Sequence, residues 1–136
     1  MSKQVWTTVK LTAHYTALAD VSGAHMQRIL DWAVANDRFV ESKAKATLFS
    51  IAGKRGDRLF AVFPSGHLYV WLEVFRFPEA AGERDSLVTD LKSQDLIKAT
   101  FDASSVKEGR TMSRKLRELN EDEMSDLMDI FATYCL

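Results

Sequence analysis

The side chains that most often catalyse reactions or bind metal ions are sparse in this sequence. His14, His25 and His67 each stand alone, without a second ligand at helical spacing. The single cysteine, Cys135, excludes an intramolecular disulfide bond and zinc sites with two or more thiolates. Ser65 follows Phe-Pro rather than the Gly-x of a nucleophile elbow. We therefore assign no catalytic residue, metal ligand or cofactor, and we expect a binding domain rather than an enzyme.

The segment Gly53-Lys54-Arg55-Gly56 has the residue types of a phosphate-binding loop but not its spacing. Neither the GxxxxGK[ST] pattern nor the GxGxxG pattern of nucleotide-binding proteins occurs in the chain. Glycine is also common at hairpin tips, because tight turns require positive φ. We therefore predict that this segment is a hairpin turn.

Basic residues gather in two parts of the chain. One group lies in and before the hairpin and consists of Lys43, Lys45, Lys54, Arg55 and Arg58. The other group precedes the final helix and consists of Lys107, Arg110, Arg114, Lys115 and Arg117. Such clusters contact phosphate groups in nucleic-acid-binding proteins. The alternative for the second group is a solvated segment that pairs with the acidic final helix.

Aliphatic and aromatic side chains alternate over residues 67–75. One parity carries Leu68, Val70, Leu72 and Val74, and the other carries His67, Tyr69, Trp71, Glu73 and Phe75. Alternate side chains of a strand point to opposite faces, so the aliphatic set is expected to face the core. Aromatic rings on the other face could stack unpaired bases. The alternative is that helices cover this face, since large rings rarely stand exposed on a monomer.

These features define a candidate nucleic-acid-binding set, which consists of Lys54, Arg55, Arg58, Tyr69, Trp71, Arg110, Arg114, Lys115 and Arg117. Two other functions are left open. Homodimerisation would bury the aromatic face against a second copy of the chain. A small-molecule site or an enzyme would need an apolar pocket in which a histidine meets a carboxylate.

The elements that must position these residues begin with a central meander. Residues 46–52, 58–63 and 67–75 are apolar and β-prone, and glycine-containing turns separate them, which predicts three antiparallel strands. Alternation predicts further strands at residues 5–15 and 97–103, and residues 104–111 are expected to form a loop.

Helices are predicted on both sides of the meander in the sequence. Apolar residues recur at helical spacing after the capping residue Asp20, and a short helix is expected near residues 87–91. The final helix should begin after Asn120, with Glu123 as its capping-box partner.

Length and composition favour one domain over residues 1–136. The chain has 136 residues and a net charge of −1, and no apolar run is long enough to span a bilayer. We expect an α+β domain in which an antiparallel meander sheet of about four to five strands packs with about two to three helices as a single pair of layers. The absence of a signal-peptide pattern favours the cytoplasm.

Three features form a pattern: the meander over residues 49–75, the helix start Arg84-Asp85-Ser86-Leu87, and Ser113-Arg114-Lys115-Leu116-Arg117-Glu118-Leu119 before the last helix. This pattern resembles small uncharacterised bacterial α+β domains that occur alone or appended to restriction-type nuclease modules, and it covers about two-thirds of the chain. The resemblance implies an accessory or regulatory domain. No acidic-x-Glu-x-Lys metal-nuclease core is present in the sequence.

Overall fold

A computed structural model describes residues 7–18, 20–41, 49–63, 65–98, 100 and 110–136. This part of the chain contains α-helices, short 3-10 helices (η) and strands. In chain order they are α1 (Thr8–Leu18), α2 (Val21–Ala35), β1 (Phe39–Glu41), β2 (Phe49–Ala52), β3 (Arg58–Val62), β4 (Leu68–Val70), η1 (Leu72–Phe75), η2 (Pro78–Ala80), α3 (Ala81–Ser93), β5 (Arg110–Thr111), η3 (Leu116–Glu118) and α4 (Glu121–Cys135).

The strands form one antiparallel sheet of five strands in the order β1-β2-β3-β4-β5. Phe49 of β2 pairs with Val62 of β3, and Val62 pairs with Leu68 of β4. The predicted α+β class and the predicted central meander are therefore confirmed. Strand β5 lies within residues 104–111, where we expected a loop, and it pairs with β4.

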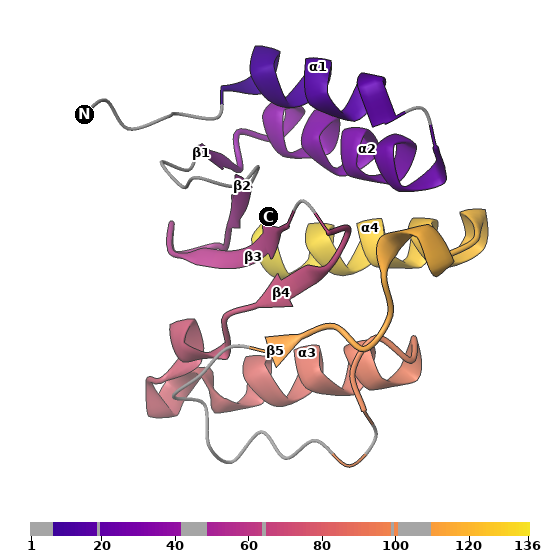
Figure 1. Ribbon diagram of the computed structural model, residues 1–136. Helices are drawn as coiled ribbons and strands as arrows, with labels where there is room; N and C mark the ends of the chain where they lie inside the picture. The colour runs from indigo at the N-terminus through magenta and orange to yellow at the C-terminus, as the bar shows by residue number, and fades with distance from the viewer. Residues whose placement is uncertain (1–6, 19, 42–48, 64, 99, 101–109) are drawn as a thin grey trace.

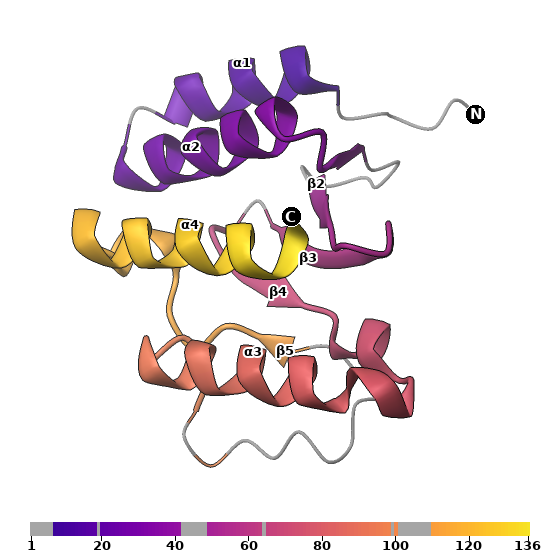
Figure 2. The ribbon, with the colours of Figure 1, turned by 180° about the vertical axis from the view of Figure 1, so that it is seen from behind.

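Helix α4 covers one face of the sheet. It crosses in front of β3 and β4 in Figure 2, and the same two strands lie in front of it in the opposite view of Figure 1. The ring of Phe60 on β3 lies 4.8 Å from that of Phe131 on α4, in an edge-to-face arrangement that marks the centre of the core. Within the described residues, no helix lies over the opposite face of β3 and β4 (Figure 1). We call this opposite side the open face.

The other helices extend the core at both ends of the sheet. Helix α1 packs on α2, and α3 packs against η1, η2 and α4. Asp20 caps α2, because its side chain accepts a hydrogen bond from Gly23 N at 2.8 Å. At α4, Glu123 N donates to Asn120 Oδ1 at 2.8 Å and Asn120 N donates to Glu123 Oε1 at 3.1 Å. The predicted capping box is thus confirmed.

The predicted strand at residues 5–15 is wrong, because the described part of this segment belongs to helix α1. Leu11 and Tyr15, which are four residues apart, are the buried residues of this helix. Helix α2 can approach closely at Gly23, where an added Cβ would lie 2.5 Å from the Tyr15 carbonyl oxygen. Burial against α2 therefore outweighs the β-propensity of the local sequence. The described residues consequently contain four α-helices, where we expected about two to three helices.

The predicted strand at residues 67–75 ends earlier than expected, at Val70. Trp71 N still donates to Leu59 O at 2.8 Å, and the 3-10 helix η1 follows. Residues three apart in a 3-10 helix lie on the same side, so Leu72 and Phe75 are both buried. The expectation that Phe75 shares a face with Tyr69 and Trp71 is therefore wrong.

The predicted strand at residues 97–103 does not begin at Ile97. Leu96 and Ile97 are buried in the core but belong to no strand. Residues 99 and 101–103 lie outside the described residues. The predicted helix near residues 87–91 is confirmed as part of α3, and it buries Leu87, Val88 and Leu91.

Candidate functional site

The open face of the sheet has a floor of small side chains. Ser50 of β2 pairs with Ala61 of β3, and Ala61 pairs with Tyr69 of β4, so the three residues form one row across the sheet. This row points away from α4, because Phe60 at the neighbouring position points toward it. Ser50 and Ala61 are small and buried, with 6% and 3% of their surface exposed, and both line a pocket.

Three aromatic rings border this floor. The ring of Tyr69 lies 4.8 Å from that of Trp71 and 5.8 Å from that of Phe63. Trp71 keeps 38% of its surface exposed, and Tyr69 and Phe63 are half-buried. Our sequence reasoning missed Phe63, although the hairpin pattern contains the signal: Phe63 lies two residues after Ala61 and therefore on the same face. We call Phe63, Tyr69 and Trp71 the aromatic ladder.

A pocket of about 540 Å³ opens beside the aromatic ladder. It is lined by Ser50, Gly56, Asp57, Arg58, Ala61, Phe63, Trp71, Glu73, Val74 and Arg76. Small-molecule sites commonly have volumes of roughly 300–1,000 Å³, so this pocket has room for one ligand group of that size. Strands β2 and β3 supply its floor, and the β2–β3 turn and η1 supply its charged walls. Phe63 and Trp71 belong to both the pocket lining and the ladder.

The pocket holds both signs of charge, from Asp57, Arg58, Glu73 and Arg76. Within the described residues, the side chains of Asp57, Arg58 and Glu73 form no hydrogen bond or ion pair. The Arg76 guanidinium lies 4.8 Å from the centre of the Phe77 ring, a distance that allows a cation–π contact. Arg76 Nη1 also donates to the backbone oxygen of Glu73 at 3.5 Å. The side chains of Asp57, Arg58 and Glu73 are exposed and unpaired among the described residues, so they are available for charge-assisted hydrogen bonds to a ligand.

Three residues of the candidate nucleic-acid-binding set come together here. Arg58 and Trp71 line the pocket, and Tyr69 connects Trp71 with Phe63. Lys54 and Arg55 lie in the same β2–β3 turn but line a separate recess of about 10 Å³. Arg55 Nη2 pairs there with Glu83 Oε2 at 3.4 Å. The basic residues of the predicted hairpin therefore lie in two places: Arg58 lines the pocket, and Lys54 and Arg55 line the separate recess.

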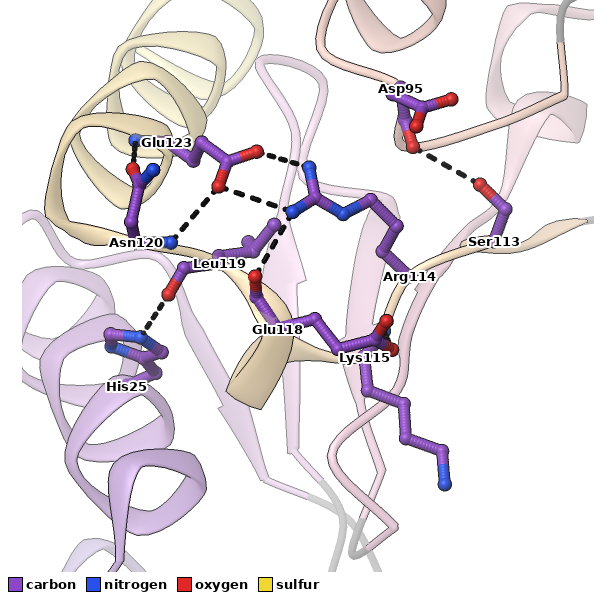
Figure 3. Close-up of polar contacts among 9 residues, drawn as sticks. All are labelled: His25, Asp95, Ser113, Arg114, Lys115, Glu118, Leu119, Asn120 and Glu123. Carbon is purple, nitrogen blue, oxygen red and sulfur yellow. Dashed lines mark hydrogen bonds and ion pairs between the residues drawn. The ribbon is translucent and has the colours of Figure 1, made fainter.

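Arg114 lies in a different polar cluster, at the start of α4 (Figure 3). Its guanidinium forms an ion pair with Glu123 and also donates to Glu118 O at 3.0 Å. The hydrogen bond from Arg114 and the bond from the Asn120 backbone hold the pKa of the Glu123 carboxyl below its usual value. This pairing is the alternative that we left open for the basic residues before the final helix. Arg114 stabilises the capped helix start in this arrangement.

The remaining residues of the candidate set do not line the pocket. Arg117 lies in η3 and is exposed, and Lys115 is the residue before η3. The 3-10 helix η3 packs against α2. Arg110 pairs with Val70 through the sheet backbone. Lys43, Lys45 and Lys107 lie outside the described residues.

His25, His67 and Cys135 have neighbours that are typical of structural residues. His25 is buried, and its Nε2 is 2.9 Å from Leu119 O, to which the ring N–H donates (Figure 3). His67 Nδ1 lies 2.8 Å from Ser65 Oγ in the β3–β4 turn. Burial raises the pKa of the Cys135 thiol to about 12, so the thiol stays protonated and unreactive at neutral pH. Within the described residues, no group of three or more His, Cys, Asp or Glu side chains is placed to hold a metal ion.

Comparison with known proteins adds no relative to this description. No protein-family model, curated protein or solved structure matches the chain. None of the helices in the described residues is both long enough and apolar enough to cross a membrane.

Proposed function

We propose that this chain is a non-enzymatic binding domain that holds an unpaired nucleic-acid strand on the open face of its sheet. The observation that carries the proposal is the partly exposed aromatic ladder beside a pocket with two arginines. Every base has a π-face, so an aromatic ring on a sheet can stack an unpaired base of any sequence. Phe63 and Trp71 both belong to the ladder and line the pocket, and Trp71 is the more exposed of the two.

The arginines of the pocket supply the second part of the proposal. Arg58 has no ion-pair partner within the described residues, whereas Arg28, Arg55, Arg84 and Arg114 each pair with a carboxylate. Arg58 and Arg76 would contact the phosphates next to a base stacked on Trp71. With only two such contacts and a net charge of −1, binding should depend on salt only moderately. An accessory role beside a nuclease module, which the resemblance implies, would use the face to hold a displaced strand.

The test is the binding of a fluorescent uridine oligonucleotide, measured by anisotropy at several salt concentrations. Each phosphate contact on a single strand contributes a slope of about −0.7 to log K against log salt, so two contacts predict about −1.4. Arg58→Gln should halve this slope. Arg117→Gln is the matched control, because Arg117 is exposed but lies outside the pocket.

Two results would contradict the proposal. One is binding that Arg117→Gln weakens and Arg58→Gln does not, which would move the site to the segment before α4. The other is an absence of binding at low salt together with concentration-dependent sedimentation, which would assign the open face to homodimerisation instead.

A further inference from the structure

We propose that Glu73 makes the pocket selective for guanine among unpaired bases, an inference that rests on the proposed function. The pocket carries two carboxylates, from Asp57 and Glu73, beside its two arginines. A site for phosphate alone gains nothing from carboxylates, since they repel the nucleic-acid backbone. Asp57 and Glu73 are exposed and have no partner within the described residues, so both carboxylates can accept hydrogen bonds from a ligand that carries donors.

Glu73 is the carboxylate placed to meet the edge of a base on Trp71. Trp71 is the residue before η1, and Glu73 lies in the first turn of that helix. The turn is held by backbone hydrogen bonds from Val74 N to Trp71 O at 3.3 Å and from Arg76 N to Glu73 O at 3.1 Å. The two side chains therefore start from one short, hydrogen-bonded segment that lines the pocket. Asp57 starts from the β2–β3 turn on another wall.

The chemistry of the four bases selects guanine. An ionised carboxylate only accepts hydrogen bonds, and it has two oxygens that can accept side by side. Guanine offers two neighbouring donors on its Watson–Crick edge, N1–H and N2–H₂, so it can form a bidentate pair with Glu73. Cytosine, adenine and uracil each place an acceptor next to their single donor group, and that acceptor would face a carboxylate oxygen. A good bidentate pair discriminates by roughly 5- to 150-fold against the wrong base.

The experiment compares uridine oligonucleotides whose central base is varied among uracil, guanine, cytosine and adenine. The unmodified protein should bind the guanine version about tenfold or more tightly than the uridine version. Glu73→Gln keeps the side-chain volume but replaces one acceptor with a donor, so this preference should fall to near onefold while binding to the uridine version persists. Glu79→Gln is the matched control, because Glu79 is exposed and lies outside the pocket, and it should keep the guanine preference. Asp57→Asn tests the other carboxylate of the pocket and should also leave the preference in place.

The outcomes separate this inference from the proposed function. Equal binding of all four oligonucleotides, or a guanine preference that survives Glu73→Gln, would overturn the inference and leave the binding function standing. Loss of the preference in Asp57→Asn alone would overturn the assignment to Glu73. Failure of every oligonucleotide to bind the folded protein at low salt would overturn both proposals.

Discussion

Replacing Trp71 with alanine should weaken strand binding while leaving the protein folded. Trp71 has 38% of its surface exposed, and its ring meets the Tyr69 ring at 4.8 Å. Loss of one aromatic pair costs about 1 kcal/mol of folding free energy. Truncation of a fully buried tryptophan costs about 3–5 kcal/mol, so the total cost at Trp71, which keeps 38% of its surface exposed, should be about 2–3 kcal/mol.

The expected loss of affinity follows from the stacking contact. Stacking of one base on an aromatic side chain contributes about 1–3 kcal/mol, so the dissociation constant should rise by roughly 5- to 150-fold. Trp71→Phe keeps a smaller π-face and should lose less. Trp32 provides the opposite control, because its ring packs on Phe131 at 5.8 Å, away from the pocket. Trp32→Phe should lower the free energy of unfolding and leave the affinity unchanged.

Two measurements on each variant decide the matter: urea denaturation for the free energy of unfolding, and anisotropy of a labelled uridine oligonucleotide for affinity. A folded Trp71→Ala protein whose dissociation constant stays within about twofold of the unmodified protein would refute the stacking role. A loss of affinity that only tracks lost stability, and that Trp32→Phe reproduces, would refute it as well.

Three further predictions concern the fold. Asn120→Ala removes the capping oxygen of α4 and should lower the free energy of unfolding in urea by about 1 kcal/mol, whereas Asn120→Asp should restore it. Burial raises the folded-state pKa of the Cys135 thiol to about 12 from an ordinary value of 9.0. The contribution of this thiol to stability is therefore complete below pH 9.0 and disappears as the pH rises toward 12. The Cys135→Ala variant should lose less stability than the unmodified protein between these pH values. Gly66→Ala should destabilise the protein more than Gly56→Ala in the same assay. Both glycines have positive φ, which costs about 1–2 kcal/mol for alanine. Only at Gly66 would the new Cβ meet another side chain, that of Ser22 at 2.9 Å.

Helix caps, strand faces and tight turns were predictable because the interactions that stabilise them join residues close together in the sequence. The capping box of Asn120 and Glu123 involves neighbouring backbone N–H groups, so three residues of spacing reveal it. The burial of Leu68 and Val70 was predictable as well, because they alternate with polar and aromatic residues and alternate side chains of a strand point to opposite faces. The tight turns of the meander likewise followed from glycine, which has positive φ at Gly56 and Gly66.

The candidate site was predictable only in part. Arg58, Tyr69 and Trp71 were expected to act together, and the pocket and the ladder do place them around one face. For Arg114 the sequence left two roles open, a phosphate contact and pairing with the acidic final helix, and the structure shows the pairing. The ion pair with Glu123 depends on how the segment before α4 runs past the start of that helix.

Tertiary structure alone decided the state of the N-terminal segment and the shape of the pocket. Residues of α1 have strand propensity, yet Leu11 and Tyr15 gain more by packing as a helix on α2, a contact that no local pattern encodes. The pocket exists because η1 turns Glu73 and Arg76 toward a floor of Ser50 and Ala61 from other strands. Sequence thus determined elements whose stabilising contacts lie within a few residues, and the fold determined everything that depends on contacts between distant ones.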